Sequence, residues 1–217
     1  MKSKIKLFIS ALVLTFLLNG CFSFFAFKKN TIVPMETEGK SGATGLNTAE
    51  NVSYLTMEEK WIIYYCNIAR MDGKLFLDTI LTPYLTEKGI KSTTFVKSLI
   101  KDLEKTRDLP LLFSQQDLFQ AAKGHAESMG NKGKIGHDGF EKRMKPFMTK
   151  YNKGVAENCQ YGYQSAKQIV IDLLIDEGVS SLGHRKNILN ASYNCVGVSI
   201  QPHKSYKYNC VMDFGGK

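Results

Sequence analysis

The octapeptide LGHRKNIL at residues 182–189 lies between a helical pattern and a strand-like pattern, and it places an imidazole at their junction. Upstream, apolar residues at helical spacing predict a helix over about 165–177, and Gly178 is a suitable stop for it. The octapeptide itself predicts a short helix that ends near Leu189. His184 would then lie in the first turn of that helix.

The other expected elements fit a mixed fold. Thr56 and Glu59 form a capping-box pattern at the start of one expected helix. Residues 130–165 are rich in glycine and are interpreted as loop. Helices before, between and beside strands predict an α+β domain. The expected helices cover 56–71, about 75–84, 95–103 and 114–129, and a hairpin joins strands over 196–200 and 206–214.

Four polar residues occur in apolar or glycine-rich contexts. His137 is flanked by glycines, Glu157 follows an apolar step, and His184 begins the short helix. Glu177 continues the apolar stripe of its helix, so it should point inward, where a carboxylate needs a cation, an imidazolium or a metal. Two imidazoles and two carboxylates could therefore meet in one cleft.

Several segments resemble, in order, the CAP superfamily of cysteine-rich secretory, antigen 5 and pathogenesis-related 1 proteins, whose fold is also called the SCP domain. The resemblance spans about residues 57–215 and implies an α-β-α sandwich with a central antiparallel sheet. The chain departs from animal members by an insertion around Leu75–Leu103 and by lacking their cysteine-rich extension, so their ligand preferences are not carried over. The matching segments are 121–129, 136–137, 156–158, 182–189 and 196–198.

The family cleft carries two histidines and two glutamates, which fall on His137, Glu157, Glu177 and His184, with Asp176 as a rival to Glu177. In the family the histidines can bind a divalent metal, commonly zinc, and carboxylates complete the shell or orient a water. His125 matches a family position outside this set, and we expect it in the core or behind the ligands.

Three functions are consistent with these residues. The favoured one is binding of a divalent cation, such as zinc, or of a small apolar ligand. The alternative is a zinc-assisted hydrolase in which Glu157 or Glu177 acts as general base. No Gly-x-Ser-x-Gly or His-Glu-x-x-His motif supplies an obvious catalytic group. In the third interpretation, the four residues form a structural polar network.

The N-terminus predicts export and lipidation. Lysines at positions 2, 4 and 6 precede an apolar run over 7–18, as in a signal peptide. The following Leu18-Asn19-Gly20-Cys21 resembles a bacterial lipobox, which implies cleavage after Gly20 and acyl chains on Cys21. An uncleaved transmembrane helix is the alternative, because the apolar run continues to about Phe27.

This N-terminus divides the chain into a signal peptide over 1–20, a lipid-anchored flexible linker over 21–55 and a CAP/SCP domain over 56–217. The expected location is extracytoplasmic, on the outer membrane if the cell has two, because no aspartate follows Cys21. The formal charge of +9 is compatible with contact to an anionic envelope component. Nucleic acid is excluded, because no basic run is interleaved with aromatic residues.

Of the five cysteines, Cys21 is assigned to the lipid and four remain. Because Cys195 and Cys210 lie on neighbouring expected strands, a Cys195–Cys210 disulfide is favoured, which leaves Cys66–Cys159 as the second pair. Buried free thiols are the alternative. Zinc binding by these four is not expected, because they lack Cys-x-x-Cys spacing.

Overall fold

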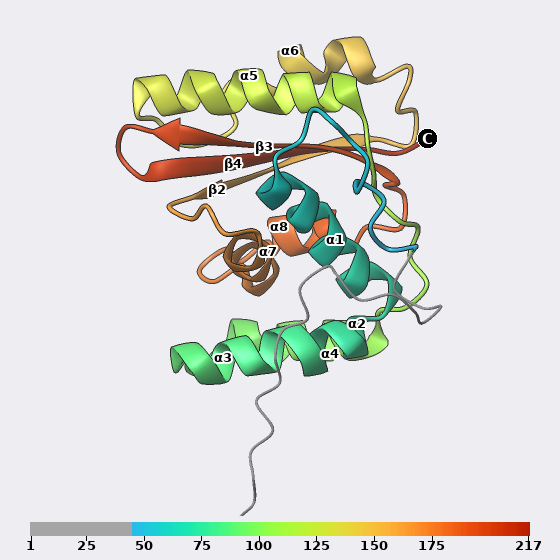
Figure 1. The fold of residues 1–217 in the computed structure, drawn as a ribbon, viewed down its shortest axis with the longest axis vertical. Coiled ribbons are helices and arrows are strands. Elements are labelled where there is room, and N and C mark those ends of the chain that lie inside the picture. The colour runs from blue at the N-terminus through green and yellow to red at the C-terminus, as the bar shows by residue number, and fades with distance from the viewer. Residues whose placement is uncertain (1–44) are drawn as a thin grey trace, which may run out of the picture. The chain divides into compact units, whose positions relative to one another are not determined.

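A four-stranded sheet lies between two layers of helices in the computed structural model, which describes residues 45–217 (Figure 1). The strand order is β1-β3-β4-β2. The short β1 pairs with β3 in parallel, and the other two pairings are antiparallel. This confirms the α+β sandwich. The strands are β1 (Phe113–Ser114), β2 (Val155–Tyr161), β3 (Cys195–His203) and β4 (Lys207–Gly215).

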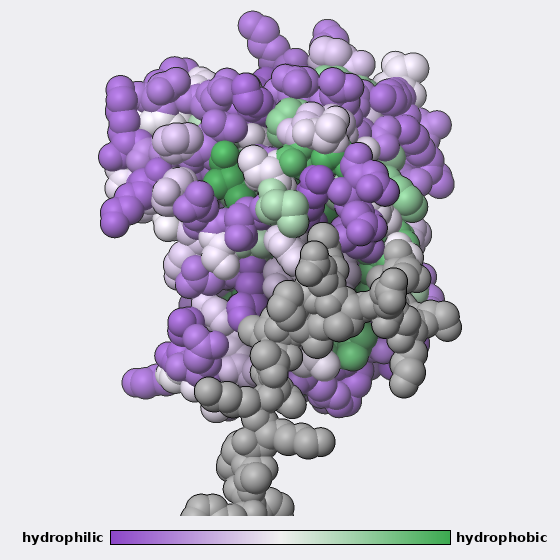
Figure 2. Space-filling view, in the orientation of Figure 1, coloured by the Kyte–Doolittle hydropathy of each residue, from purple (hydrophilic) through white to green (hydrophobic). Residues whose placement is uncertain are grey.

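One face of the sheet is covered by α5 (Gln116–Lys132), with the short α6 (Phe140–Met144) and a 3-10 turn (Lys145–Phe147) beside it (Figure 1). The outward surface of this layer is mainly hydrophilic (Figure 2). Its inward surface comes very close to β3, since a Cβ atom at Gly197 would lie 2.0 Å from the carbonyl carbon of Leu118. Only glycine permits this approach.

The opposite face of the sheet packs on α1 (Met57–Met71), α7 (Ala166–Ile175) and α8 (Gly183–Ile188). The capping box that the sequence predicts at Thr56 and Glu59 is present. Oε1 of Glu59 also accepts a hydrogen bond from the backbone N–H of Ile200, which ties α1 to β3.

The predicted insertion forms a further layer outside α1 and α7 (Figure 1). Fully buried Arg185 fastens this layer to the sandwich, because it donates to the carbonyl oxygens of Phe95 and Leu174 and to the Asp102 carboxylate. Among the helices of residues 45–217, none has the length and apolar character needed to cross a membrane. The insertion comprises α2 (Gly73–Phe76), a π-helical turn (Leu77–Leu81), α3 (Thr82–Lys88) and α4 (Thr94–Lys105).

Residues 45–55 belong to the folded domain, so the predicted flexible linker extends too far toward the C-terminus. Ala49 is fully buried, and the Asn67 amide donates hydrogen bonds to Leu46 and Thr48. These contacts order a segment whose composition is typical of a spacer. The signal peptide, Cys21 and the first part of the linker lie outside the described residues.

The interpretation of 130–165 as loop is wrong for β2 and α6. Strand β2 has polar residues on both faces, with Glu157 and Cys159 on the α5 side and Asn158 and Gln160 on the other. The usual alternation of polar and apolar residues is therefore missing from its sequence.

The predicted disulfides are also wrong, since all four cysteines within residues 45–217 are buried free thiols. In the β3–β4 hairpin, Cys195 is opposite Gly215 and Cys210 is opposite Ile200. Cys159 packs under α5, whereas Cys66 lies in the core on the other face of the sheet. The register and the opposite faces therefore keep the members of each predicted pair from lying side by side.

The close contact of α5 with β3 gives a matched pair of substitutions. Gly197→Ala should lower the free energy of unfolding by about 1–3 kcal/mol or more, because the new methyl group overlaps the α5 backbone. Gly124→Ala, on the open side of α5, should raise it by about 0.5–1 kcal/mol. Chemical denaturation measures both, and equal effects would contradict the close packing.

Candidate functional site

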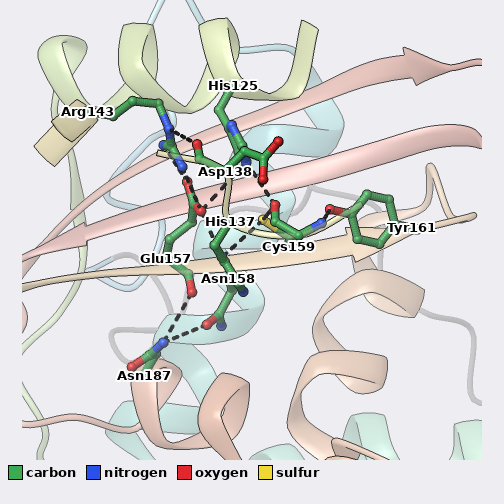
Figure 3. Close-up of polar contacts among 10 residues, drawn as sticks. His125, His137, Asp138, Arg143, Glu157, Asn158, Cys159, Tyr161 and Asn187 are labelled. Carbon is green, nitrogen blue, oxygen red and sulfur yellow. Dashed lines mark hydrogen bonds and ion pairs between the residues drawn. The ribbon is translucent and has the colours of Figure 1, made fainter. Parts of the chain in front are cut away.

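The Glu157 carboxylate is the centre of a polar cluster at the edge strand β2. Its side chain is almost completely buried. Arg143 of α6 donates two hydrogen bonds to it, Nη1 to Oε2 at 2.7 Å and Nη2 to Oε1 at 3.0 Å (Figure 3). This two-point contact balances the buried negative charge.

His137 binds the same carboxylate from the loop that precedes α6. Its Nδ1 lies 2.8 Å from Oε1 of Glu157 (Figure 3). Because a carboxylate oxygen accepts, Nδ1 carries the hydrogen, and Nε2 of the neutral ring is an unprotonated acceptor. The His137 side chain is 48% exposed, so this nitrogen is accessible to a ligand.

These contacts determine the acidity of Glu157. Burial alone would raise the pKa of its carboxyl group, but the hydrogen bonds from His137 and Arg143 outweigh burial and lower the pKa to about 2. Glu157 is therefore ionised at neutral pH and is a poor proton acceptor.

A second histidine–carboxylate pair lies at the start of α8. Nδ1 of His184 is 2.7 Å from Oδ1 of Asp176, and Oδ2 of Asp176 accepts the backbone N–H groups of His184 and Arg185. The Asp176 carboxylate thus both caps α8 and orients the His184 imidazole. As in His137, Nε2 of the neutral His184 ring is left as the acceptor.

The predicted inward orientation of Glu177 is wrong. Helix α7 ends at Ile175, and Asp176 takes the left-handed conformation with φ of 58°, which breaks the helical stripe on which the prediction rested. The Glu177 side chain is exposed, and its Oε2 accepts a hydrogen bond from Thr93 at 2.6 Å. Asp176, the predicted rival, is the acid that contacts His184.

A small hollow lies beside these groups. It has a volume of about 200 Å³, and its lining includes Cys159, Asp176, Glu177 and His184. His137 is not among the residues that line the hollow, but the Sγ of Cys159, which is, lies 3.7 Å from Nδ1 of His137. The hollow is smaller than the roughly 300–1,000 Å³ of pockets for drug-sized ligands, which favours an ion with its waters over an apolar ligand.

A buried group of donor atoms lies next to Glu157. Ligand atoms of His125, Glu157 and Cys159 all fall within 4.8 Å of one another, so this group could hold a metal ion. His125 descends from α5, with Nε2 3.7 Å from Oε1 of Glu157 and 3.0 Å from the Gly136 carbonyl oxygen. Burial lowers the pKa of His125 despite the Glu157 charge, so the ring is neutral.

Asp213 of β4 lies directly opposite Glu157 in the sheet. The side chain is fully buried, and no hydrogen-bond donor within residues 45–217 reaches either carboxyl oxygen. Burial and the Glu157 charge raise the pKa of Asp213 well above its usual range, so it is protonated at neutral pH.

The sequence did not single out Arg143 or Asp213, and it assigned Cys159 to a disulfide. Arg143 lies in a glycine-rich stretch where no periodic pattern reveals its direction. Asp213 carried a usable signal, since an acid within the apolar strand sequence CVMDFG requires a partner or a raised pKa.

A family model described as CAP, the cysteine-rich secretory protein family, matches residues 63–214. This match covers more than half of the chain and includes both histidine–carboxylate pairs. The chain therefore belongs to the CAP family, as its sequence motifs predicted. No match was found among curated proteins.

Solved structures include similar chains from three bacteria. An extracellular SCP-domain protein from Bacillus anthracis is 24% identical over 50% of this chain and 35% of its own, with a TM-score of 0.41. An outer surface protein from Borrelia burgdorferi is 20% identical over 59% of this chain and 96% of its own length, with a TM-score of 0.43. A cysteine-rich secretory protein from Staphylococcus aureus is 17% identical over 59% of this chain and 40% of its own length, with a TM-score of 0.41. The chain thus spans less than half of the first and third.

Proposed function

We propose that this chain is a membrane-tethered, extracytoplasmic CAP-domain protein whose cleft binds a divalent metal ion through His137 and His184. The observation that carries the proposal is the pairing of each imidazole with a buried carboxylate. Nδ1 of His137 contacts Glu157 at 2.8 Å, and Nδ1 of His184 contacts Asp176 at 2.7 Å.

The residues fit a zinc-class ion. Zinc takes neutral imidazole nitrogens, and a carboxylate on the other ring nitrogen is its usual second-shell partner. Glu157 and Asp176 would hold the two rings in the required tautomer. A bound divalent ion would supply a positively charged centre for an anionic or carbonyl-containing ligand.

The contacts of Glu157 weigh against the hydrolase alternative. A general base needs a pKa near the working pH. Hydrogen bonds from Arg143 and His137 lower the pKa of Glu157 to about 2. Glu177 is directed to Thr93 and lacks contact with either imidazole among the hydrogen bonds of residues 45–217. Binding is therefore the better-supported function.

The lipid anchor on Cys21 and the extracytoplasmic location are supported by the signal-peptide and lipobox patterns. The names of two similar structures, an extracellular protein and an outer surface protein, agree with this location. The partners that follow are the membrane, through the lipid, and a component of the cell envelope.

Zinc titration by calorimetry tests the cleft. The His137→Ala/His184→Ala double variant should lose a class of zinc binding that the wild-type chain shows. Asp176→Asn should weaken that binding by about 10- to 100-fold, because it removes the partner that orients His184. The adjacent Glu177→Gln is the matched control and should bind as the wild type does. A double variant that retains all of the wild-type zinc binding would refute the proposal.

The tether has its own test. The mature protein should carry acyl chains on Cys21 as its first residue, and Cys21→Ser should move the protein out of the membrane fraction. Mass spectrometry of the purified N-terminus and cell fractionation measure these outcomes. An intact Met1 on the mature wild-type chain would exclude the lipoprotein assignment and favour an uncleaved anchor.

A further inference from the structure

A second set of possible metal-binding atoms lies between α5 and β2. It does not include Nε2 of His137 or Nε2 of His184. It comprises Nε2 of His125, the Glu157 carboxylate and Sγ of Cys159, all within 4.8 Å of one another. Each of the three residues is buried. Figure 3 shows them converging from the helix above and from the strand.

The spacing of these atoms is close to that of a tetrahedral zinc shell. Zinc–ligand bonds of about 2.0–2.3 Å place neighbouring ligand atoms about 3.3–3.7 Å apart. Nε2 of His125 lies 3.7 Å from Oε1 of Glu157. The Gly136 carbonyl oxygen, 3.0 Å from Nε2 of His125 and 3.7 Å from Sγ of Cys159, adds a fourth possible ligand atom beside them. Side-chain shifts of a fraction of an ångström to about one ångström would close the shell.

The charge around these atoms also favours a cation. Glu157 and Asp213 face each other across β2 and β4, and Arg143 is the cation that contacts Glu157. Asp213 is fully buried and has no donor within residues 45–217. Glu157 is ionised, and a thiolate at Cys159 would bring a second negative charge to a divalent ion.

We propose that His125, Glu157 and Cys159 form a second, buried site for one thiophilic divalent ion of the zinc class. On binding, Cys159 releases its proton to solvent. The hydrogen on Nε2 of His125 leaves that nitrogen, and Nδ1 of the neutral ring carries one instead. The Cys159–metal bond replaces the S–H bond, with no change in oxidation state.

The thiolate determines which ions this site takes. Cysteine sulfur favours zinc, cobalt and cadmium over magnesium and calcium, which prefer shells of oxygen ligands. The cleft defined by His137 and His184 offers nitrogen but no sulfur among its proposed ligands. The two sites therefore differ in a property that spectroscopy can separate.

Cobalt absorption tests the proposal on the full-length chain in detergent. Co²⁺ bound to a thiolate gives an intense sulfur-to-metal absorption band in the near ultraviolet, which imidazole ligands do not give. The wild type and the His137→Ala/His184→Ala double variant should both show this band. Cys159→Ser should abolish it, whereas Cys195→Ser, at another buried cysteine, should keep it.

A second variant guards against misfolding of Cys159→Ser. His125→Gln should keep the band but weaken the affinity for Co²⁺. Loss of an outer-shell partner weakens metal affinity by about 10- to 100-fold, and loss of the ligand His125 should weaken it more. The absence of the band from the wild type would overturn the proposal, and so would its persistence in Cys159→Ser. If the band is present but the double variant binds zinc as the wild type does, the proposed cleft function fails and the buried site stands.

Discussion

The ionised Glu157 carboxylate is buried within an edge strand, and the surrounding structure depends on balancing its charge. A buried carboxylate is strongly destabilising unless it is paired and hydrogen-bonded. Arg143 supplies the cation, and His137 supplies a further donor. The segment between α5 and β2 must therefore fold back over the strand to bring both side chains to it. The position of His137 is a direct consequence of this pairing.

Strand β2 connects the two histidine–carboxylate pairs through adjacent residues that point to opposite faces of the sheet. Glu157 holds His137 on the α5 side. Asn158 donates to the backbone carbonyl of His184 at 3.0 Å, and its own side-chain oxygen accepts from Asn187 of α8 at 2.8 Å (Figure 3). A shift of the strand by one residue would exchange these contacts, which would break the His137–Glu157 pair and the hydrogen bond from Asn158 to α8. The Glu-Asn dipeptide of the sequence therefore has a structural role for each of its members.

Much of the fold, and the positions of three of the four predicted cluster residues, could be inferred from the sequence. His137, Glu157 and His184 occur in local motifs, and their placement follows from short-range patterns. Glu177 was misplaced because helical periodicity was extended past the true end of α7, where Asp176 takes a left-handed conformation that a non-glycine residue rarely adopts. Strand β2 was missed because it is polar on both faces. Whether two cysteines can form a disulfide depends on the face of the sheet that each one occupies. For Cys159 and Cys210 this can be assigned only when the register of β2 against β4 is known.

Buried carboxylates hold both rings with the hydrogen on Nδ1, which leaves Nε2 of each ring unprotonated. Long-range ¹H–¹⁵N NMR spectra of the metal-free, full-length chain, recorded where the rings are neutral, report the tautomer of each histidine directly. We expect His137 and His184 both to be protonated at Nδ1, with Nε2 unprotonated. Protonation of either ring at Nε2 would contradict it, because that nitrogen would then lack the lone pair that a metal ion requires.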